Sequence, residues 1–415
     1  MTDPKSTRAA VLAHIDAHHA GQVDFLAELI RVPSDNPPGD CAAHAARAAT
    51  LLEAQGFTVE RHPVPAETVR ASGMISATNL IVRHRFGAGP TVALNAHGDV
   101  VAPGAGWTSD PYGAERRGGR MYGRGVAVSK SDFATYGFAL KGLRDIGAEL
   151  GGTVELHLTY DEETGGAIGP AWLLEQGLTR PDYAVSAGFA HAITVAHNGC
   201  LHLEVTVRGR SAHAARPDTG VDALEAATKL LTALYAMRAA LAAKTSGVPG
   251  IGHPTLVVGL IKGGINTNVV PDTVTFRIDR RIIPEESAAQ AEAGLRAAIA
   301  EAAAALPGIT VDVTRILLAT PLGPVPGQER LVAALQEGAV AAGYEALPTD
   351  GTPIYTDARL YSGAGIPTVL FGAGPRNMLE ANGHRADENL LLEDLRRATR
   401  ITALGLMALL GPPLP

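Results

Sequence analysis

The stretch Thr91-Val-Ala-Leu-Asn-Ala-His97-Gly-Asp99 has the pattern of a buried strand that ends in an imidazole and a carboxylate. Open α/β sheets bind their ligands at the carboxyl ends of such strands. An imidazole two residues before a carboxylate can hold a metal while the carboxylate orients the ring. A histidine and an aspartate at this spacing also occur in proteins with a purely structural role. This stretch alone therefore indicates a buried strand more strongly than it indicates a metal site.

The segments around this strand predict an α/β layer architecture. A second buried strand is expected at Thr153–Thr159, and a helical pattern over 132–143 precedes it. Helical patterns also cover 23–30 and 42–55, with the proline-rich segment 33–39 between them. Proline removes backbone donors and fixes φ, so that segment is expected to be irregular. Strands that alternate with helices are typical of α/β domains.

The middle of the chain has a different pattern. The segment Leu201-His-Leu-Glu-Val-Thr-Val207 alternates as a half-buried strand does, and a helix is expected over 222–243. Two strands (255–261 and 272–278), a second helix (286–305) and a strand near 309–313 follow. This order predicts an antiparallel sheet with helices on one face, large enough to be a separate inserted domain. We expect one domain formed by 1–199 and 316–415, with a second domain at 200–315 inserted into it.

Composition excludes several classes of protein. The chain has 415 residues, 46% of them hydrophobic, and a formal net charge of −7. An acidic balance argues against nucleic acid as the main partner. No run of about 18 apolar residues predicts a membrane span, and the first residues lack the apolar stretch of a secretory signal. With only two cysteines, a disulfide framework or a Cys-rich zinc module is not expected. We therefore expect a soluble, cytoplasmic protein.

Two further clusters carry chemistry. Asp161-Glu162-Glu163 follows the expected strand Thr153–Thr159 and is closed by Gly165-Gly166. Adjacent side chains on an extended segment diverge, so one glutamate can bind a metal while the other transfers protons. A solvated acidic turn is an equal alternative. The third cluster, 381–388, contains His384 and the pair Asp387-Glu388, which could simply favour the N-terminus of the last helix.

Taken together, the order and surroundings of the three clusters resemble the M20 metallopeptidases, which include carboxypeptidase G2-type enzymes, aminoacylase and succinyl-diaminopimelate desuccinylase. The resemblance covers nearly the whole chain. Further matching motifs are Trp107-Thr-Ser-Asp110-Pro-Tyr112, Met121-Tyr-Gly-Arg-Gly125, Ser211-Ala-His213, Pro217-Asp-Thr-Gly220, Gly264-Ile-Asn266-Thr-Asn268-Val-Val-Pro271, Asp279-Arg-Arg281-Ile-Ile-Pro284 and Gly365-Ile-Pro-Thr368.

The resemblance implies a fold and a role for each matching residue. The expected fold is a catalytic α/β domain, with a mixed sheet flanked by helices, and an inserted ferredoxin-like lid and dimerisation domain. The implied metal ligands are His97, Glu163 and His384. The implied catalytic residues are Glu162 as general base, Asp99 as the carboxylate that orients His97, and His213, which reaches the active site of the partner subunit. The implied substrate-binding residues are Asn266 and Arg281. A homodimer or higher homo-oligomer acting on a small carboxylate-bearing molecule is expected.

Two positions depart from the family pattern. Val128 stands where the family has an aspartate that bridges two metal ions, and Gly188 stands where it has an acidic ligand. Two divalent ions about 3.5–4 Å apart repel by on the order of 17 kcal/mol at an effective dielectric near 20. Without a shared carboxylate the two-metal site should be lost. Asp132, His191 and His197 could replace the missing ligands, although each is expected to be structural or to support a ligand.

One divalent transition-metal ion per subunit is therefore expected. Two histidines and a carboxylate suit Zn, Mn, Ni, Co or Fe, and the loss of two anionic ligands predicts a labile ion. The leading hypothesis is a metal-dependent hydrolase that cleaves a C–N bond through an activated water. One alternative is an aromatic aminohydrolase of the 5-nitroanthranilate type. Another is a relative that only binds a ligand, although the retained histidines and carboxylates argue against it.

Overall fold

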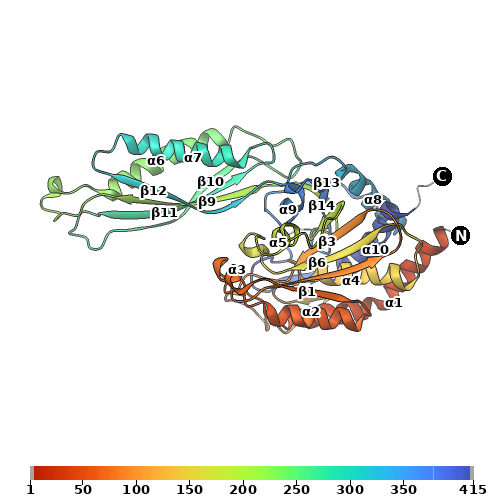
Figure 1. Ribbon diagram of the computed structural model, residues 1–415. Coiled ribbons are helices and arrows are strands. Elements are labelled where there is room, and N and C mark those ends of the chain that lie inside the picture. The colour runs from red at the N-terminus through yellow and green to blue at the C-terminus, as the bar shows by residue number, and fades with distance from the viewer. Residues whose placement is uncertain (1–3, 377, 412–415) are drawn as a thin grey trace. The chain divides into compact units, whose positions relative to one another are not determined.

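The computed structural model describes residues 4–376 and 378–411, which divide into two compact units (Figure 1). Unit 1 comprises Met1–Val195, Pro324–Asp350 and Thr356–Pro415, and unit 2 comprises Ala196–Gly323 and Gly351–Tyr355. The short return segment Gly351–Tyr355 was not anticipated from the sequence. The domain limits drawn at 199/200 and 315/316 stay a prediction, since compact units and folding domains need not coincide.

Unit 1 is built around a mixed sheet with the strand order β1-β2-β6-β3-β7-β14-β8-β13. Its strands are β1 (Val59–Pro63), β2 (Thr78–Arg85), β3 (Thr91–His97), β6 (Thr153–Thr159), β7 (Tyr183–Ser186), β8 (Ile193–His197), β13 (Thr349–Thr352) and β14 (Thr368–Leu370). A small sheet contains β4 (Glu115–Arg117), β5 (Arg120–Tyr122) and β15 (Asn389–Leu391). The helices are α1 (Pro4–Ile30), α2 (Ala42–Ala54), α3 (Ala66–Ala71), α4 (Lys130–Asp145), α5 (Pro170–Glu175), α8 (Gln328–Ala341), α9 (Ala358–Gly363) and α10 (Leu392–Leu410), with a short 3₁₀ turn, η1 (Glu162–Thr164).

Helices cover both faces of this sheet because its central strands are apolar on both sides. On β3, Val92 and Leu94 belong to the main hydrophobic core, to which α1, α2, α4, α8 and α10 contribute. Ala93 points to the opposite face, where it packs with Ala184 and with Tyr361 of α9. Strands buried on both faces form near-continuous apolar runs, which is the pattern seen at Thr91–His97. The expectation of a mixed sheet flanked by helices is confirmed.

The register of the parallel strands brings the functional segments to one edge. β3 pairs in parallel with β6, where His97 is opposite Thr159, and with β7, where Asn95 is opposite Ser186. The carboxyl ends of three neighbouring strands therefore lie together. The residues that follow them, 98–99, 160–164 and 187–188, emerge at the edge where open α/β sheets bind ligands.

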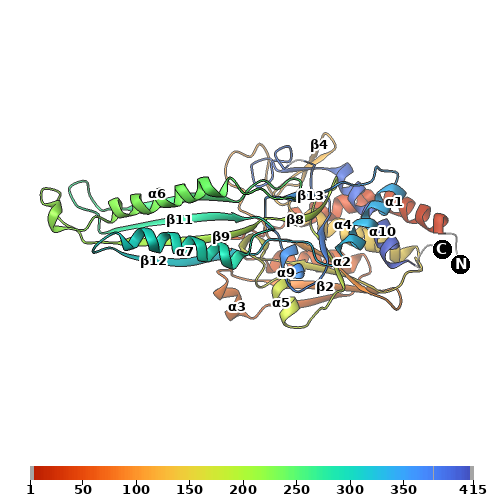
Figure 2. The ribbon, with the colours of Figure 1, turned by 90° about the horizontal axis from the view of Figure 1, so that it is seen from above.

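Unit 2 is an antiparallel sheet covered on one face by two helices. Its strands are β9 (Gly199–Arg208), β10 (Thr255–Gly263), β11 (Thr273–Ile282) and β12 (Thr310–Ala319); its helices are α6 (Ala223–Leu241) and α7 (Ala288–Ala304), with a 3₁₀ turn, η2 (Pro217–Thr219). The strand order β10-β11-β9-β12 in a β-α-β-β-α-β chain is the ferredoxin-like arrangement that was expected. Figure 2 shows α6 and α7 running side by side along the sheet.

The helices of unit 2 cover only one face of its sheet. On β9, Leu201, Leu203 and Val205 are buried in the core beneath α6 and α7. Because side chains alternate along a strand, Cys200 and His202 point to the opposite face. α6 begins where Asp222 accepts hydrogen bonds from the backbone N–H groups of Leu224 and Glu225, at 2.8 and 3.0 Å.

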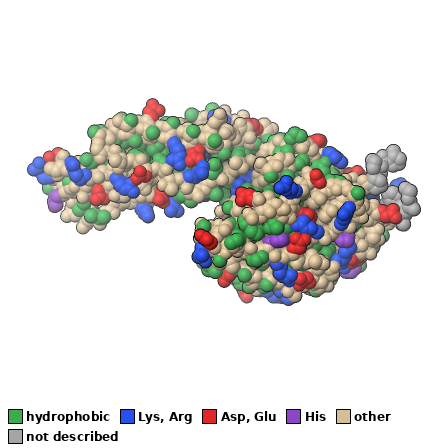
Figure 3. Space-filling view, in the orientation of Figure 1, with side chains coloured by type: hydrophobic (Ala, Val, Ile, Leu, Met, Phe, Trp, Pro, Cys, Tyr) green, Lys and Arg blue, Asp and Glu red, His purple; other side chains and the backbone are tan. Residues whose placement is uncertain are grey.

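Within residues 4–376 and 378–411, no helix is both long and apolar enough to cross a bilayer. Acidic and basic side chains are interspersed on the face shown in Figure 3.

Candidate active site

Three predicted residues converge at the carboxyl edge of the unit 1 sheet. His97 ends β3, and Glu162 and Glu163 begin η1, directly after β6. One ligand atom from each of these three residues lies within 4.8 Å of the other two. His97 is 6% exposed, so the group is nearly closed off from solvent. The parallel pairing of β3 and β6 places a histidine from one segment and two glutamates from another at the same edge of the sheet.

Asp99 organises this group. It is fully buried, and its Oδ1 and Oδ2 accept hydrogen bonds from the backbone N–H groups of Glu162 and Glu163, at 3.3 and 3.1 Å. Asn36 Nδ2 donates a further hydrogen bond to Oδ2 at 2.9 Å. His97 Nδ1 lies 3.0 Å from the backbone oxygen of Asp99 and 3.4 Å from its Oδ1. The ring is thus held through Nδ1, and Nε2 is the atom presented to Glu162, whose Oε2 is 3.9 Å away.

His384 joins the group through Glu163. Its Nε2 lies 3.4 Å from Glu163 Oε1, and its side chain is 47% exposed. Glu163 Oε1 is buried and accepts no hydrogen bond from the described residues. A buried carboxylate oxygen without a donor calls for another partner. The set of donor atoms, two imidazoles and a carboxylate, fits a divalent cation at this oxygen.

Electrostatics in the site reflect an excess of buried negative charge. Burial raises the pKa of Glu162 well above its usual value, and the neighbouring Glu163 raises it further. Burial alone would lower the pKa of His97, but the charges of Glu162 and Asp99 raise it well above 6.5. The nearby Glu163 carboxylate raises the pKa of His384. A carboxylate with a raised pKa is suited to receive and release a proton near neutral pH.

Two more buried carboxylates lie beside this group. Asp357 is buried at the start of α9, with its Oδ2 lacking a hydrogen-bond partner among the described residues. Burial raises its pKa to about 7. Burial also raises the pKa of Asp161, and the charge of Asp357 adds to this effect. Sequence reasoning missed Asp357, because a single aspartate in a loop nearly 200 residues from Asp161 gives no local signal.

A buried ion pair supports the loop that carries Val128. Arg124 and Glu388 are both fully buried and paired. Glu388 Oε1 also accepts hydrogen bonds from the backbone N–H groups of Ala127 and Val128, at 2.9 and 3.3 Å. The idea that Glu388 favours the N-terminus of the last helix is wrong, because β15 intervenes and α10 begins at Leu392.

Position 188 has no room for a ligand side chain, and the acidic residue that could replace a missing ligand, Asp132, has another partner. Gly188 follows β7, and a Cβ atom at this position would lie 2.6 Å from the backbone nitrogen of Phe371. Asp132 is buried in α4 and accepts a hydrogen bond from the backbone N–H of Ala373 at 2.6 Å. Burial raises the pKa of Asp132 to about 7. Its carboxylate thus connects α4 to the loop after β14.

The two histidines considered as replacement ligands have other partners. His191 Nε2 lies 2.8 Å from Asp394 Oδ1, and its Nδ1 lies 3.1 Å from Arg376 Nη2. His197 is the buried last residue of β8, and its Nδ1 lies 2.9 Å from the backbone oxygen of Asn198. Neither histidine is part of the His97–Glu162–Glu163 group.

The three remaining predicted residues all belong to unit 2. His213 and Asn266 are exposed, and their loops are joined by a hydrogen bond from Ala214 N–H to the Asn268 backbone oxygen at 2.9 Å. Arg281 lies on β11 and binds the Asp279 carboxylate through Nε and Nη2, at 3.0 and 3.1 Å. The structure therefore brings His213 close to the Asn266 loop, but not to Arg281.

Comparisons with known proteins agree with this geometry. Residues 93–407 match the model of peptidase family M20/M25/M40. The chain is 29% identical over 385 residues to succinyl-diaminopimelate desuccinylase of Rhizorhabdus wittichii, covering 90% of this chain and 94% of the relative. It is 31% identical over 278 residues to acetylornithine deacetylase of Erwinia tasmaniensis, covering 66% of this chain and 68% of that enzyme.

A solved structure shares the fold. The match is to a Bacillus subtilis protein described as a dinuclear metal-binding peptidase of the M20 family, with a TM-score of 0.68 and 17% identity. It covers 95% of this chain and 99% of that one. The chain belongs to peptidase family M20/M25/M40, a family of C–N bond hydrolases.

Proposed function

We propose that this protein hydrolyses a C–N bond in a small carboxylate-bearing molecule with the help of one divalent metal ion. The observation that carries the proposal is the convergence of His97, Glu162 and Glu163, which Asp99 holds in place. His384 Nε2 lies beside Oε1 of Glu163. His97, Glu163 and His384 would hold the ion. When bound there, the ion supplies a Lewis acid that polarises the scissile group and lowers the pKa of water.

Glu162 is the residue that moves the proton. It lies beside the proposed ligands without being needed as one of them, and burial raises its pKa. It would take a proton from the attacking water as the new C–O bond forms. It would then pass that proton to the leaving nitrogen as the C–N bond breaks, which restores the carboxylate. Asp99 acts as a positioning residue, because it fixes the His97 ring and the backbone of both glutamates.

Three observations support one ion instead of two. Val128 offers no ligand atom. The backbone at Phe371 fills the space that a side chain at position 188 would need. Asp132, the nearest acidic replacement along the chain, already accepts a backbone hydrogen bond from Ala373. With two anionic ligands fewer, the ion is expected to be weakly held.

The positions of His213, Asn266 and Arg281 support a dimer. His213 follows the end of β9 at Arg208, and Arg208 pairs with Thr273 of β11. Arg281 lies near the other end of β11, opposite Cys200. Eight residues of extended strand separate these ends by about 26 Å. One substrate cannot reach both ends of the same sheet, so a site that uses His213 and Arg281 together requires two chains.

The edge strand β10 offers a surface for such an assembly. It is an outer strand of the unit 2 sheet and carries Val257, Leu260 and Ile261, which are 50%, 61% and 52% exposed. Unpaired, apolar edge strands tend to pair with another chain. We propose that β10 contributes to a homodimer in which His213 and Asn266 serve the neighbouring subunit's site.

The substrate class follows from the relatives and from Arg281. The two relatives are named for removing a succinyl or an acetyl group. The Arg281 guanidinium could bind a substrate carboxylate bidentately if it were released from Asp279. N-acyl amino acids are therefore the first compounds to test.

A matched pair of variants tests the proposal. Glu162→Gln should lower kcat for N-acyl amino acid hydrolysis about 10²- to 10⁴-fold, with metal binding retained. Glu175→Gln changes an exposed glutamate on α5 and should leave kcat unchanged. Equal turnover by the Glu162→Gln variant and the unmodified protein would contradict the assigned role of Glu162.

A further inference from the structure

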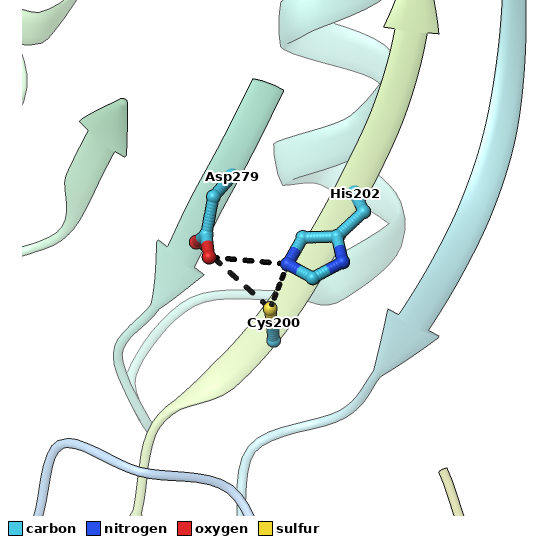
Figure 4. Close-up of side chains that lie close together, drawn as sticks. All are labelled: Cys200, His202 and Asp279. Carbon is cyan, nitrogen blue, oxygen red and sulfur yellow. Dashed lines mark hydrogen bonds and ion pairs between the residues drawn. The ribbon is translucent and has the colours of Figure 1, made fainter. Parts of the chain in front are cut away.

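A second group of metal-ligating side chains lies on the face of the unit 2 sheet opposite its helices (Figure 4). Cys200 Sγ is 3.2 Å from His202 Nε2, and His202 Nε2 is 3.1 Å from Asp279 Oδ2. Cys200 Sγ is 3.9 Å from Asp279 Oδ1. A sulfur, a nitrogen and an oxygen atom thus converge on one point.

The register of the sheet creates this convergence. Cys200 and His202 are two residues apart on β9, so their side chains share a face. On the adjacent strand β11, His202 is paired with Asp279, and Cys200 is paired with Arg281. The helices cover the opposite face, where Leu201 and Leu203 are buried. No rearrangement of the backbone is needed to bring the three ligand atoms together.

We propose that Cys200, His202 and Asp279 form a binding site for a divalent cation of borderline softness, such as Zn²⁺. Zinc binds cysteine sulfur at about 2.3 Å and histidine nitrogen at about 2.0–2.1 Å. In a tetrahedral site these bond lengths put the sulfur and nitrogen about 3.5 Å apart. The observed separation of 3.2 Å requires only a small movement of the side chains to admit an ion. The proposal does not depend on the roles assigned to His97, Glu163 and His384 of unit 1.

The surroundings favour an exchangeable site over a closed structural one. Cys200 is buried, whereas the side chains of His202 and Asp279 are 35% and 32% exposed. Three protein ligands with solvent on one side leave a fourth position open. Arg281 holds the Asp279 carboxylate through two hydrogen bonds, at 3.0 and 3.1 Å. Ligating carboxylates are commonly oriented by such hydrogen bonds.

The same three residue types could also form a nucleophilic triad, but their geometry does not. In a triad, the acid binds one ring nitrogen and the nucleophile binds the other. Here the Cys200 sulfur and the Asp279 carboxylate both meet His202 Nε2. Convergence on one nitrogen is the arrangement of a set of ligands around an ion.

Cobalt(II) substitution tests the proposal directly. A thiolate ligand gives Co²⁺ an intense charge-transfer band in the near ultraviolet, and no sulfur atom belongs to the His97–Glu162–Glu163 group. Under reducing conditions, titration of the full-length protein with Co²⁺ should produce this band, and its final intensity should correspond to one thiolate-bound ion per chain. Cys200→Ser should abolish the band. His202→Gln should weaken the Co²⁺ affinity measured at this band at least 10-fold.

Two control variants locate the signal. Cys41→Ala removes the other cysteine, which is buried in the core of unit 1, and should retain the band. His97→Ala should retain it too, since His97 belongs to the other group. No thiolate band in the unmodified protein, or an unchanged band in Cys200→Ser, would overturn the proposal.

Discussion

Gly188 and Phe371 are packed so closely that a Cβ atom at position 188 would lie 2.6 Å from the backbone nitrogen of Phe371. It would also lie 2.7 Å from the carbonyl carbon of Leu370. Both neighbours are backbone atoms at the end of β14, so they cannot rotate away. The absence of an acidic ligand at position 188 is thus accompanied by packing that excludes any side chain there.

Gly188→Ala should destabilise the protein. The added methyl group must displace the end of β14, and overpacking of this kind costs about 1–3 kcal/mol. Urea unfolding monitored by circular dichroism measures the change. Gly363→Ala is a suitable control, because a Cβ atom at position 363 would meet no atom within 4 Å. Equal unfolding midpoints for Gly188→Ala and the unmodified protein would contradict the described packing.

Glu388→Gln should lower stability far more than a comparable change at the surface. It leaves the buried Arg124 guanidinium uncompensated, which typically costs about 3–5 kcal/mol. Glu380→Gln is the matched control, because it breaks an arginine–glutamate pair in which the glutamate is 58% exposed. Surface pairs contribute about 0–1 kcal/mol. Similar free energies of unfolding for the two variants would show that the buried pair does not hold the Val128 loop.

Asp99→Asn should weaken metal binding without removing a ligand. An amide cannot accept the backbone hydrogen bonds of both Glu162 and Glu163, so His97 and Glu163 lose their fixed positions. Changes to residues that orient ligands typically cost 10- to 100-fold in affinity. Competition with a chromophoric chelator measures this affinity in a Cys200→Ser background, which isolates the site in unit 1. An unchanged affinity in a folded variant would remove Asp99 from this role.

Glu155 should make stability depend on pH in the acid range. Burial alone would raise its pKa, but hydrogen bonds from His157 and Thr179 and the charge of Arg83 lower the pKa below 4.5. The folded state therefore holds the proton less tightly than the unfolded state. This contribution is present above pH 4.5 and is lost as the pH falls through the lower folded value.

The Glu155→Gln variant tests this dependence. At pH 7 it should be less stable than the unmodified protein by about 1.5–3 kcal/mol, the usual contribution of hydrogen bonds to a charged group. The difference should narrow as the pH is lowered toward 3, because the native carboxylate then becomes protonated too. Guanidinium unfolding at both pH values measures it. A constant difference would contradict the assigned pKa direction.

The local sequence pattern was enough to predict the strands whose ends position the site residues. The apolar strands Thr91–His97 and Thr153–Thr159 each end in polar residues, and parallel pairing necessarily places those ends together. The alternation in Leu201–Val207 similarly predicted a half-buried strand, and β9 has that pattern. Such patterns depend on neighbours in the chain, which a single sequence displays.

The parts that escaped prediction depend on contacts between distant segments. Arg124 pairs with a glutamate 264 residues away, and nothing near either residue signals the pair. Asp279 meets His202 only because β9 and β11 are adjacent in a particular register. With just two cysteines in the chain, a thiolate ligand was not expected. A single cysteine can nevertheless contribute to a metal site when strand pairing places a histidine and an aspartate beside it.

Anomalous diffraction from crystals soaked with Zn²⁺ tests the one-ion site most directly, because it locates each ion individually. The account predicts a single anomalous peak in unit 1, bonded to His97, Glu163 and His384. Any peak at Cys200 belongs to unit 2 and is counted separately. Two peaks about 3.5–4 Å apart beside His97, or none near these ligands at saturating zinc, would contradict the account.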